Sequence, residues 1–302
     1  MREFAGKVAV VTGAASVIGR GLAGRFARAG MRVALADVER EPLAIAEREL
    51  ASAGAEVIAV PTDVTSVASV EGLRDRVLER WGKVHVLCNN AGVSGGGGPV
   101  WAATERDWQW VLGVNLMGVV HGLQAFVPSM LAHGEEGHIV NTSSVLGLST
   151  GNGSVYGVSK HAVTRLTEGL YFDLRAAGSR IGVSVLCPGM IATRIIEAER
   201  NRPAALRDEG REASEVVAAQ RAAMSARFQA EGMAPDEVGE IVFEAVREGR
   251  FYILTHPAIK ERVRVRTEDI LGDRPPTPPA PGGELAGLGR PPGVEGDARG
   301  TV

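Results

Sequence analysis

Tyr156 and Lys160 stand four residues apart, and Ser143 and Ser144 precede them at the end of an apolar run. On a helix, this spacing places the phenol and the ammonium on one face. A free tyrosine titrates near ~10, so it exchanges protons poorly at neutral pH unless a neighbouring cation favours the phenolate. We therefore expect Lys160 to lower the pKa of Tyr156. The pair predicts a proton-transfer site with Tyr156 as acid and base.

Short apolar runs that alternate with helical patterns must position these side chains. Strands are expected at 8–11, 32–36, 57–61, 84–88, 138–142, 182–187 and 251–255, and helices at 18–29, 41–53, 67–81, 105–113, 115–132 and 155–176. Continuous β-branched strands between helices are typical of a parallel sheet that is covered on both faces. Right-handed crossovers then give an α/β fold, a doubly wound (Rossmann) three-layer sandwich with a seven-stranded parallel sheet.

The turn after the first predicted strand is rich in glycine. Gly13 permits a tight turn, and Gly19 permits close packing of helix on strand. The N-terminus of the following helix offers free N–H groups and a positive dipole end to a pyrophosphate. Asp37 ends the second strand, where a carboxylate accepts hydrogen bonds from an adenosine ribose and repels a 2′-phosphate. Val38 supplies no cation to offset that repulsion, so the sequence favours NAD over NADP.

Together these residues resemble the short-chain dehydrogenase/reductase superfamily over roughly residues 4 to 257. The matching segments, in the family's order, are Thr12-Gly13 through Gly19, Asp63-Val64, Asn89-Asn90-Ala91-Gly92, Asn115, Ser143-Ser144, Tyr156 with Lys160, and Pro188-Gly189 with Thr193. The resemblance implies a cofactor site formed by Gly13, Ser16, Val17, Ile18, Gly19, Asp37, Asp63, Val64, Asn90, Ala91, Gly92, Tyr156, Lys160, Pro188, Gly189, Ile191 and Thr193. It also implies a catalytic set of Asn115, Ser144, Tyr156 and Lys160, in which Asn115 holds a water that links the lysine to solvent.

Two residues, Ser143 and Ser144, are candidates for the catalytic serine. The family's usual separation of thirteen residues from the tyrosine selects Ser143, whereas the local pattern Ile-Val-Asn-Thr-Ser-Ser-x-x-Gly selects Ser144. We favour Ser144, because a strand end is rigid and a one-residue deletion in the following loop costs little. Neighbouring side chains on a strand point to opposite faces, so only one serine can face the substrate.

Val17 departs from the family's pattern, which has glycine at this position. Valine disfavours a left-handed backbone and adds two methyl groups at the helix entrance. Three consequences remain open: the loop shifts and NAD still binds, NAD binds weakly, or the protein has left redox chemistry.

Composition and segment boundaries set further expectations. A net charge of -3 gives no reason to expect nucleic acid or an anionic membrane as partner. No uninterrupted apolar run is long enough to span a membrane, and the N-terminus lacks a secretion signal, so a cytoplasmic protein is expected. Cys88 and Cys187 lie in apolar runs and should be buried thiols. The histidines and cysteines lack metal-ligand spacing, so no metal is expected.

Residues 1–272 are predicted to form one catalytic domain with a substrate lid at about 190–233. Residues 273–302 are rich in proline and glycine and should form a disordered tail. Candidate apolar walls at Val93, Trp101, Val145, Leu146 and Leu148, together with the start of the lid, suggest a hydrophobic alcohol or ketone substrate. The resemblance further implies a homodimer or homotetramer.

The sequence thus predicts an NAD-dependent oxidoreductase that acts on a secondary alcohol or ketone. The alternative is a non-redox isomerase, dehydratase or cyclase that uses the Tyr-Lys pair for proton transfer. A cofactor-sensing protein without turnover is disfavoured, because a sensor has no need of a proton relay.

Overall fold

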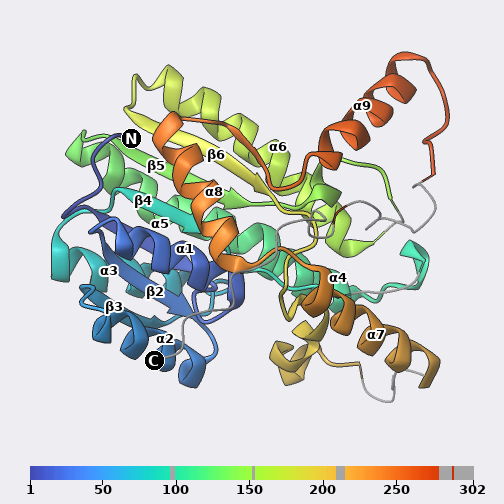
Figure 1. Ribbon diagram of the computed structural model, residues 1–302, viewed down its shortest axis with the longest axis horizontal. Coiled ribbons are helices and arrows are strands. Elements are labelled where there is room, and N and C mark those ends of the chain that lie inside the picture. The colour runs from blue at the N-terminus through green and yellow to red at the C-terminus, as the bar shows by residue number, and fades with distance from the viewer. Residues whose placement is uncertain (96–98, 152–153, 209–214, 279–287, 289–302) are drawn as a thin grey trace.

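The computed structural model describes residues 1–95, 99–151, 154–208, 215–278 and 288. Within them, seven parallel strands form one sheet in the order β3-β2-β1-β4-β5-β6-β7 (Figure 1). The strands are β1 (Val8–Thr12), β2 (Arg32–Asp37), β3 (Val57–Pro61), β4 (Val86–Asn89), β5 (Gly137–Thr142), β6 (Ile181–Cys187) and β7 (Tyr252–Leu254). The strand order reverses between β1 and β4, which is where a doubly wound sheet opens a crevice for a ligand. The predicted fold class is confirmed.

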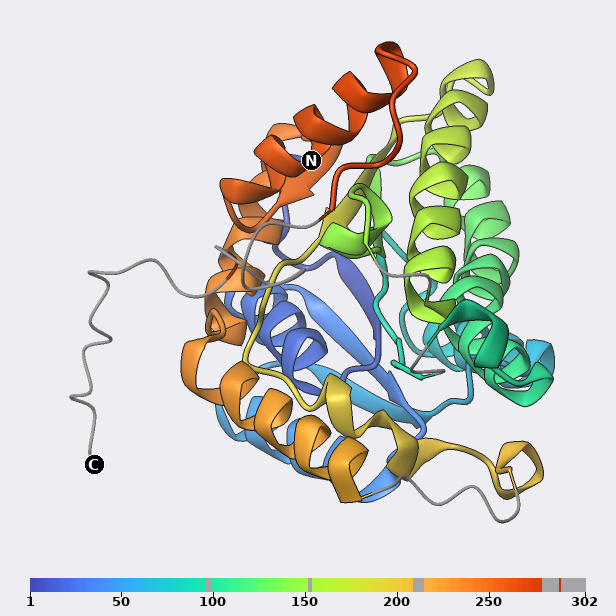
Figure 2. The same ribbon diagram turned by 90° about the vertical axis from the view of Figure 1, so that its right-hand side faces the viewer.

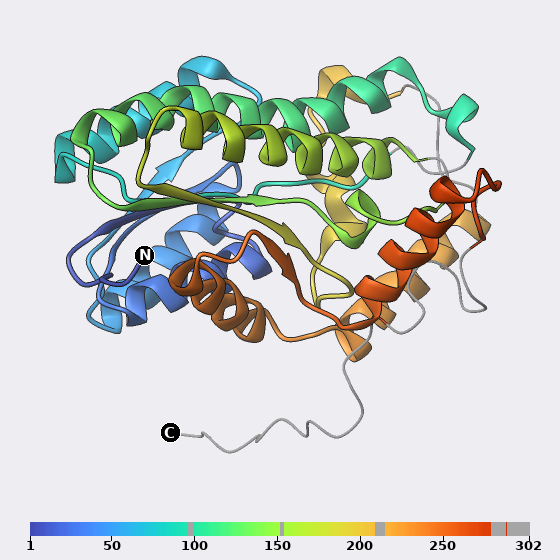
Figure 3. The same cartoon turned by 90° about the horizontal axis from the view of Figure 1, so that it is seen from above.

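Helices cover both faces of the sheet, and two further helices, α7 and α9, lie beyond the strand ends. The helices are α1 (Val17–Arg28), α2 (Arg40–Ser52), α3 (Val67–Trp81), α4 (Glu105–Leu112), α5 (Gly118–His133), α6 (Val155–Ala176), α7 (Glu215–Glu231), α8 (Pro235–Glu248) and α9 (Ala258–Leu271). Figure 3 shows α3, α5 and α6 on one face of the sheet and α1, α2 and α8 on the other. In the same view α7 and α9 lie at the end toward which the strands point.

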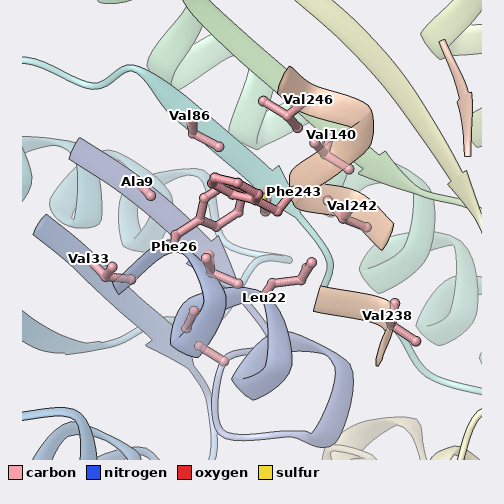
Figure 4. Close-up of a cluster of buried hydrophobic side chains, with 14 of the residues drawn as sticks. Ala9, Leu22, Phe26, Val33, Val86, Val140, Val238, Val242, Phe243 and Val246 are labelled. Atoms are coloured by element: carbon pink, nitrogen blue, oxygen red, sulfur yellow. The ribbon is translucent and has the colours of Figure 1, made fainter. Parts of the chain in front are cut away.

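The core between α1, α8 and the sheet is built from large side chains on the helices and small ones on the strands. Phe26 of α1 and Phe243 of α8 meet edge to face, with ring centroids 6.1 Å apart. They pack over strand residues such as Ala9 and Val86 (Figure 4). Gly21 and Gly239 let α1 and α8 touch, because a Cβ on either would lie within 2.4 Å of the other helix's backbone. This close packing fixes the turn before α1, where the cofactor was predicted to bind.

Most predicted elements are present, with two informative differences. The helices at 67–81 and 155–176 have the predicted bounds, whereas the helical region 105–132 contains a π-helical turn, Gly113–Met117, between α4 and α5. The sequence prediction missed α9 altogether. Only Ile259 and Asp269 of this helix are buried, so it lacks the apolar stripe that reveals a core helix.

One helical stretch, Glu105–His133, is long and apolar enough to span a membrane by length and composition alone. The sequence contains no uninterrupted apolar run there, which is why none was predicted. In the structure α5 packs against α3 and the sheet through Phe126 and Met130. Its apolar character therefore has a structural explanation inside this domain.

Cys88 and Cys187 are buried free thiols, as predicted. Residues 273–278 of the C-terminal segment are exposed, but Leu288 is fully buried against Val145, Met190 and Phe228. Its carbonyl oxygen accepts a hydrogen bond from the Met190 N–H at 3.1 Å. The rest of the predicted tail, 279–287 and 289–302, lies outside the described residues.

Candidate active site

A crevice of about 1690 Å³ opens beyond the carboxyl ends of the strands, under the segment predicted as a lid. Its walls include most of the predicted site residues: Gly13, Ser16, Ile18, Gly19, Asp37, Asp63, Val64, Asn90, Ala91, Gly92, Ser144, Tyr156, Lys160, Pro188, Gly189, Ile191 and Thr193. Val17 and Asn115 are not among the residues that line it. The fold therefore brings side chains from seven separate segments to one place.

The turn between β1 and α1 leaves no room for a side chain at Gly13 or at Gly19. Gly13 has a left-handed backbone with a φ of +68°, and a Cβ there would lie 2.9 Å from the Ala91 Cα. A Cβ on Gly19 would lie 2.1 Å from the Gly13 carbonyl oxygen. Ser16 is the N-cap of α1, and its side chain makes no capping hydrogen bond. The helix therefore opens onto the crevice with backbone N–H groups available to an anion, which fits a dinucleotide pyrophosphate.

Val17 is the first residue of α1, where its backbone is helical. Among described residues other than glycine, only Asp273 has a positive φ. The valine is thus in a conformation that it adopts without strain. The structure removes the concern that this position demands a left-handed backbone.

Asp37, the last residue of β2, lies in the wall of the crevice. Its carboxylate accepts hydrogen bonds from the N–H groups of Ala15 and Glu39, both at 3.0 Å. Burial raises the pKa of Asp37, while these two N–H groups act in the opposite direction. Val38 is exposed beside it and carries no charge.

Thr12 was not predicted as a site residue, although it holds the two halves of the crevice together. Its hydroxyl oxygen accepts hydrogen bonds from the N–H groups of Asn90, at 2.9 Å, and Ala91, at 3.1 Å. Its carbonyl oxygen accepts a third, from the Asn90 side-chain amide. The turns after β1 and β4 are therefore joined across the switch point. Its position directly before Gly13 was the available signal in the sequence.

The reaction end of the crevice is carried by α6. Ser154 caps this helix by accepting a hydrogen bond from the Gly157 N–H at 3.0 Å, and Tyr156 and Lys160 follow on one face. The Lys160 ammonium is buried and donates to the Thr142 carbonyl oxygen at 2.9 Å. Burial lowers its pKa to about 8. Its Nζ lies 5.6 Å from the centroid of the Tyr156 ring.

The pKa of Tyr156 is raised, whereas the sequence led us to expect that it is lowered. Burial raises it, and a hydrogen bond with Ser144 opposes that rise. The predicted lowering by Lys160 does not appear, because the ammonium is directed to the Thr142 carbonyl and is itself destabilised by burial. In this structure the phenol is therefore in its protonated form at neutral pH.

The two serines have different environments. The Ser143 hydroxyl donates to the Lys160 carbonyl oxygen at 2.8 Å and bonds the Thr164 hydroxyl at the same distance, so it faces the back of α6. The Ser144 hydroxyl accepts from the Leu146 N–H at 3.2 Å and lies close enough to the Tyr156 phenol to oppose the rise in its pKa. Of the two, Ser144 is the one beside the phenol.

Asn115 lies in the π-helical turn and is fully buried. Its carboxamide pairs with both backbone groups of Val93, accepting from the N–H at 2.8 Å and donating to the carbonyl at 3.0 Å. It also donates to the Ser159 hydroxyl at 2.9 Å. These bonds fasten the chain after β4 to α6 at Ser159, the residue directly before Lys160. The π-helical turn directs the Asn115 side chain inward.

Apolar side chains surround the reaction end. Val93, Trp110, Val145, Leu146, Ile195, Ile196, Leu206 and Phe228 line this part of the crevice. Trp101, a predicted wall, is instead exposed and does not line it. Trp110 takes that place, because α4 buries its ring against the Arg202 guanidinium, 4.2 Å away.

Comparison with known proteins agrees with this geometry. A family model described as short chain dehydrogenase matches residues 7–204. The chain belongs to the short-chain dehydrogenase/reductase family. The matched part of this family member runs from the strand before the glycine turn into the lid, while α8, β7 and α9 lie beyond it.

Several family members are similar along most of the chain. A short-chain dehydrogenase/reductase from Burkholderia phymatum, solved in complex with NAD, is 49% identical with a TM-score of 0.88, and the match covers 92% of this chain and 99% of that one. The CLA biosynthesis dehydrogenase/reductase of Lactiplantibacillus plantarum is 32% identical over 91% of this chain and 97% of its own length. The 1-deoxy-11-beta-hydroxypentalenate dehydrogenase of Streptomyces exfoliatus is 36% identical over 92% of this chain and 94% of its own length. Other solved members of the family that match this chain are described with NADP or NADPH.

Proposed function

We propose that this protein is an NAD-dependent oxidoreductase that interconverts a hydrophobic secondary alcohol and its ketone. One observation carries the proposal: the Tyr156 phenol, beside Ser144, lies in a crevice that is also lined by glycines, backbone N–H groups and Asp37. A proton-transfer group and a dinucleotide-shaped cradle thus share one cavity.

The residues present fit a dinucleotide. The α1 N-terminus would hold the pyrophosphate, because the missing side chains at Gly13 and Gly19 leave the backbone accessible. Asp37 would accept the adenosine ribose hydroxyls. A 2′-phosphate would meet its carboxylate with no cation at Val38, which supports NAD over NADP. Asp63 and Val64 would flank the adenine. The walls toward the nicotinamide would be formed by Asn90, Ala91, Gly92, Pro188, Gly189, Ile191 and Thr193.

The nicotinamide, when bound, supplies or accepts the hydride. The chain's own task is to move a proton on the substrate oxygen. In reduction, Tyr156 donates the proton from its phenolic oxygen, and Ser144 donates a hydrogen bond to the same substrate oxygen and fixes its position. Lys160 supplies positive charge near the phenolate that remains, and Asn115 keeps the neighbouring backbone in place.

The apolar wall supports a hydrophobic substrate. Val145 and Leu146 follow Ser144 directly, while Ile195, Ile196 and Phe228 face them from the lid. A site of this kind gains more from apolar carbon than from a sugar hydroxyl. The alternative of a non-redox enzyme was raised because of Val17. This residue lies unstrained in α1 and does not line the crevice, so it gives no support to that alternative.

Self-association through α5 and α6 forms part of the proposal. These helices lie side by side on one face (Figures 2 and 3), and Val158 and Phe172 of α6 are exposed there. Exposed apolar side chains on a surface helix favour a two-fold helix contact. Light scattering should show a dimer or tetramer at micromolar concentration.

A cofactor-resolved screen tests the function. Purified protein would be offered a panel of apolar secondary alcohols with NAD or NADP, followed by absorbance at 340 nm, with polyols of similar size as control substrates. We expect NADH formation from at least one apolar alcohol, with kcat/KM at least tenfold higher for NAD than for NADP. Absence of absorbance change with every alcohol and ketone, together with product formation when no cofactor is added, would support the non-redox alternative.

A further inference from the structure

An ion pair joins the lid to the adenosine corner of the crevice. Arg200, in the 3₁₀ helix Ile195–Asn201, donates two hydrogen bonds to the Glu39 carboxylate, from Nη2 at 2.8 Å and from Nε at 3.1 Å. Glu39 is the N-cap of α2, two residues after Asp37. The hydrogen bond from Arg200 is the main reason why the pKa of Glu39 is lowered. A paired, planar geometry of this kind is the strongest form of arginine–carboxylate contact.

The Arg200 guanidinium is held in place from its own side as well. Its Nη1 donates to the Glu197 carbonyl oxygen at 3.1 Å, within the same 3₁₀ helix. Motion of Arg200 therefore carries this helix with it. Both Arg200 and Glu39 line the crevice in which Asp37 and Gly13 lie. The ion pair consequently closes one side of the space where the adenosine half of a dinucleotide would sit.

A second ion pair holds the same stretch of the lid, two residues further along the chain. Arg202 bonds Asp107 of α4 at 2.6 Å, and their side chains are only 5% and 6% exposed. Arg200 and Glu39 are 26% and 20% exposed, so water reaches them more easily. Breaking the buried pair would leave unpaired charge in the protein, whereas the more exposed pair can exchange its partner for water. The lid thus has a permanent attachment at α4 and a breakable one at α2.

We propose that the Arg200–Glu39 ion pair is a latch that retains the bound dinucleotide, and that this latch must open before the cofactor leaves. The inference rests on the proposed NAD-dependent function. The Arg202–Asp107 pair keeps the next residues of the lid on α4 while the latch residues separate at the adenosine end. Cofactor release is then controlled by residues that touch neither the nicotinamide nor the substrate.

The test is the rate of NADH release, measured by stopped-flow fluorescence with excess NAD as displacing ligand. Glu39→Gln keeps the side-chain shape and removes the charge, and Arg200→Gln removes the other partner. We expect each variant to release NADH about three- to tenfold faster than the natural protein. The double variant should release it no faster than the quicker single variant, because both changes break one interaction. Raising the salt concentration should speed release from the natural protein and leave Glu39→Gln unaffected.

The matched control is Glu197→Gln. It removes the same charge from an ion pair inside the lid, between Glu197 and Arg194. The side chain of Arg194 is 51% exposed and that of Glu197 is 47% exposed. Its release rate should stay within about twofold of the natural protein. Hydrogen exchange of residues 195–201 in the cofactor-free proteins, together with circular dichroism, would verify that each variant is folded and that only the latch variants loosen this segment.

Two results would overturn the latch. Unchanged release rates in Glu39→Gln and Arg200→Gln would show that the pair does not control departure of the cofactor. Rate effects that add in the double variant would show two independent contacts in place of one latch. If the natural protein gives no NADH fluorescence change at all, the proposed function fails and the latch with it, which distinguishes that outcome from normal binding with unaltered release.

Discussion

The two ends of the crevice are built on different principles. The end next to β1 and β2 depends on side chains that are absent: Gly13 and Gly19 leave the backbone accessible to the ligand, and Asp37 adds a carboxylate. The end next to β5 and α6 depends on side chains that are present and placed close together, Ser144 beside the Tyr156 phenol and Lys160 held by the Thr142 carbonyl. Substitution at the first end should therefore damage the fold and binding, whereas substitution at the second should remove chemistry and leave the fold intact or firmer.

The largest effect is expected at Gly19. A Cβ there would lie 2.1 Å from the Gly13 carbonyl oxygen, so Gly19→Ala must move the backbone of the turn. We expect a loss of about 3 kcal/mol in unfolding free energy and loss of measurable NADH binding. Gly72→Ala in α3 is the control, because nothing lies within 4 Å of its added Cβ, and it should be neutral or stabilising. Chemical denaturation and NADH titration of both variants measure the contrast, which equal stabilities would refute.

Lys160→Met should show the opposite behaviour. Burial lowers the pKa of Lys160 to about 8, against an ordinary value of 10.5. The unfolded chain thus binds the proton more tightly, so the charged lysine costs stability fully below about pH 8, and the cost disappears as pH rises toward 10.5. We expect the variant to lose turnover yet gain about 1–3 kcal/mol of unfolding free energy at pH 7, with the gain vanishing near pH 10. Lys260→Met on exposed α9 should change stability by less than about 0.5 kcal/mol. A destabilised Lys160→Met at pH 7 would contradict this account.

The two serines provide a narrower contrast within one strand end. Ser144→Ala removes the hydrogen bond that opposes the rise in the Tyr156 pKa, so we expect kcat to fall about tenfold to a hundredfold. The rise in the rate of alcohol oxidation with pH should also move to higher pH, because a higher Tyr156 pKa means that the phenolate forms only at higher pH. Ser143→Ala breaks bonds to the Lys160 carbonyl and Thr164, and should cost about 1 kcal/mol of stability with less than a threefold rate change. A larger rate loss at Ser143 would reverse the assignment. Full pH–rate profiles of both variants provide the measurement.

The smallest effect is expected at Val17. Because this residue is helical and does not line the crevice, Val17→Gly should change the NADH dissociation constant by less than about threefold. Fluorescence titration decides the matter. A tenfold gain in affinity in the glycine variant would mean that the valine does obstruct the pyrophosphate.

The sequence was sufficient to predict which residues meet at the glycine end of the crevice. It predicted the properties of the catalytic end only in part. Strand order and the meeting of Gly13, Asp37 and Asn90 follow from chirality and hydrophobic period, because parallel strands bring their carboxyl ends to one edge. The direction of the Tyr156 pKa did not follow, since burial and the orientation of Lys160 toward Thr142 are properties of packing. The contact between Arg200 and Glu39 joins residues 161 positions apart, and no local period encodes it. The weak apolar pattern of α9 likewise concealed a real helix.

The central claim is that the Tyr156 phenol moves the proton while the rest of the crevice holds the cofactor. The direct measurement is kcat/KM for one accepted alcohol with NAD, in the natural protein and in Tyr156→Phe, alongside an NADH titration of both. The account predicts a loss of about 10²- to 10⁴-fold in kcat/KM with NADH affinity unchanged within about twofold. Turnover by Tyr156→Phe within tenfold of the natural protein, at equal NADH affinity, would contradict it.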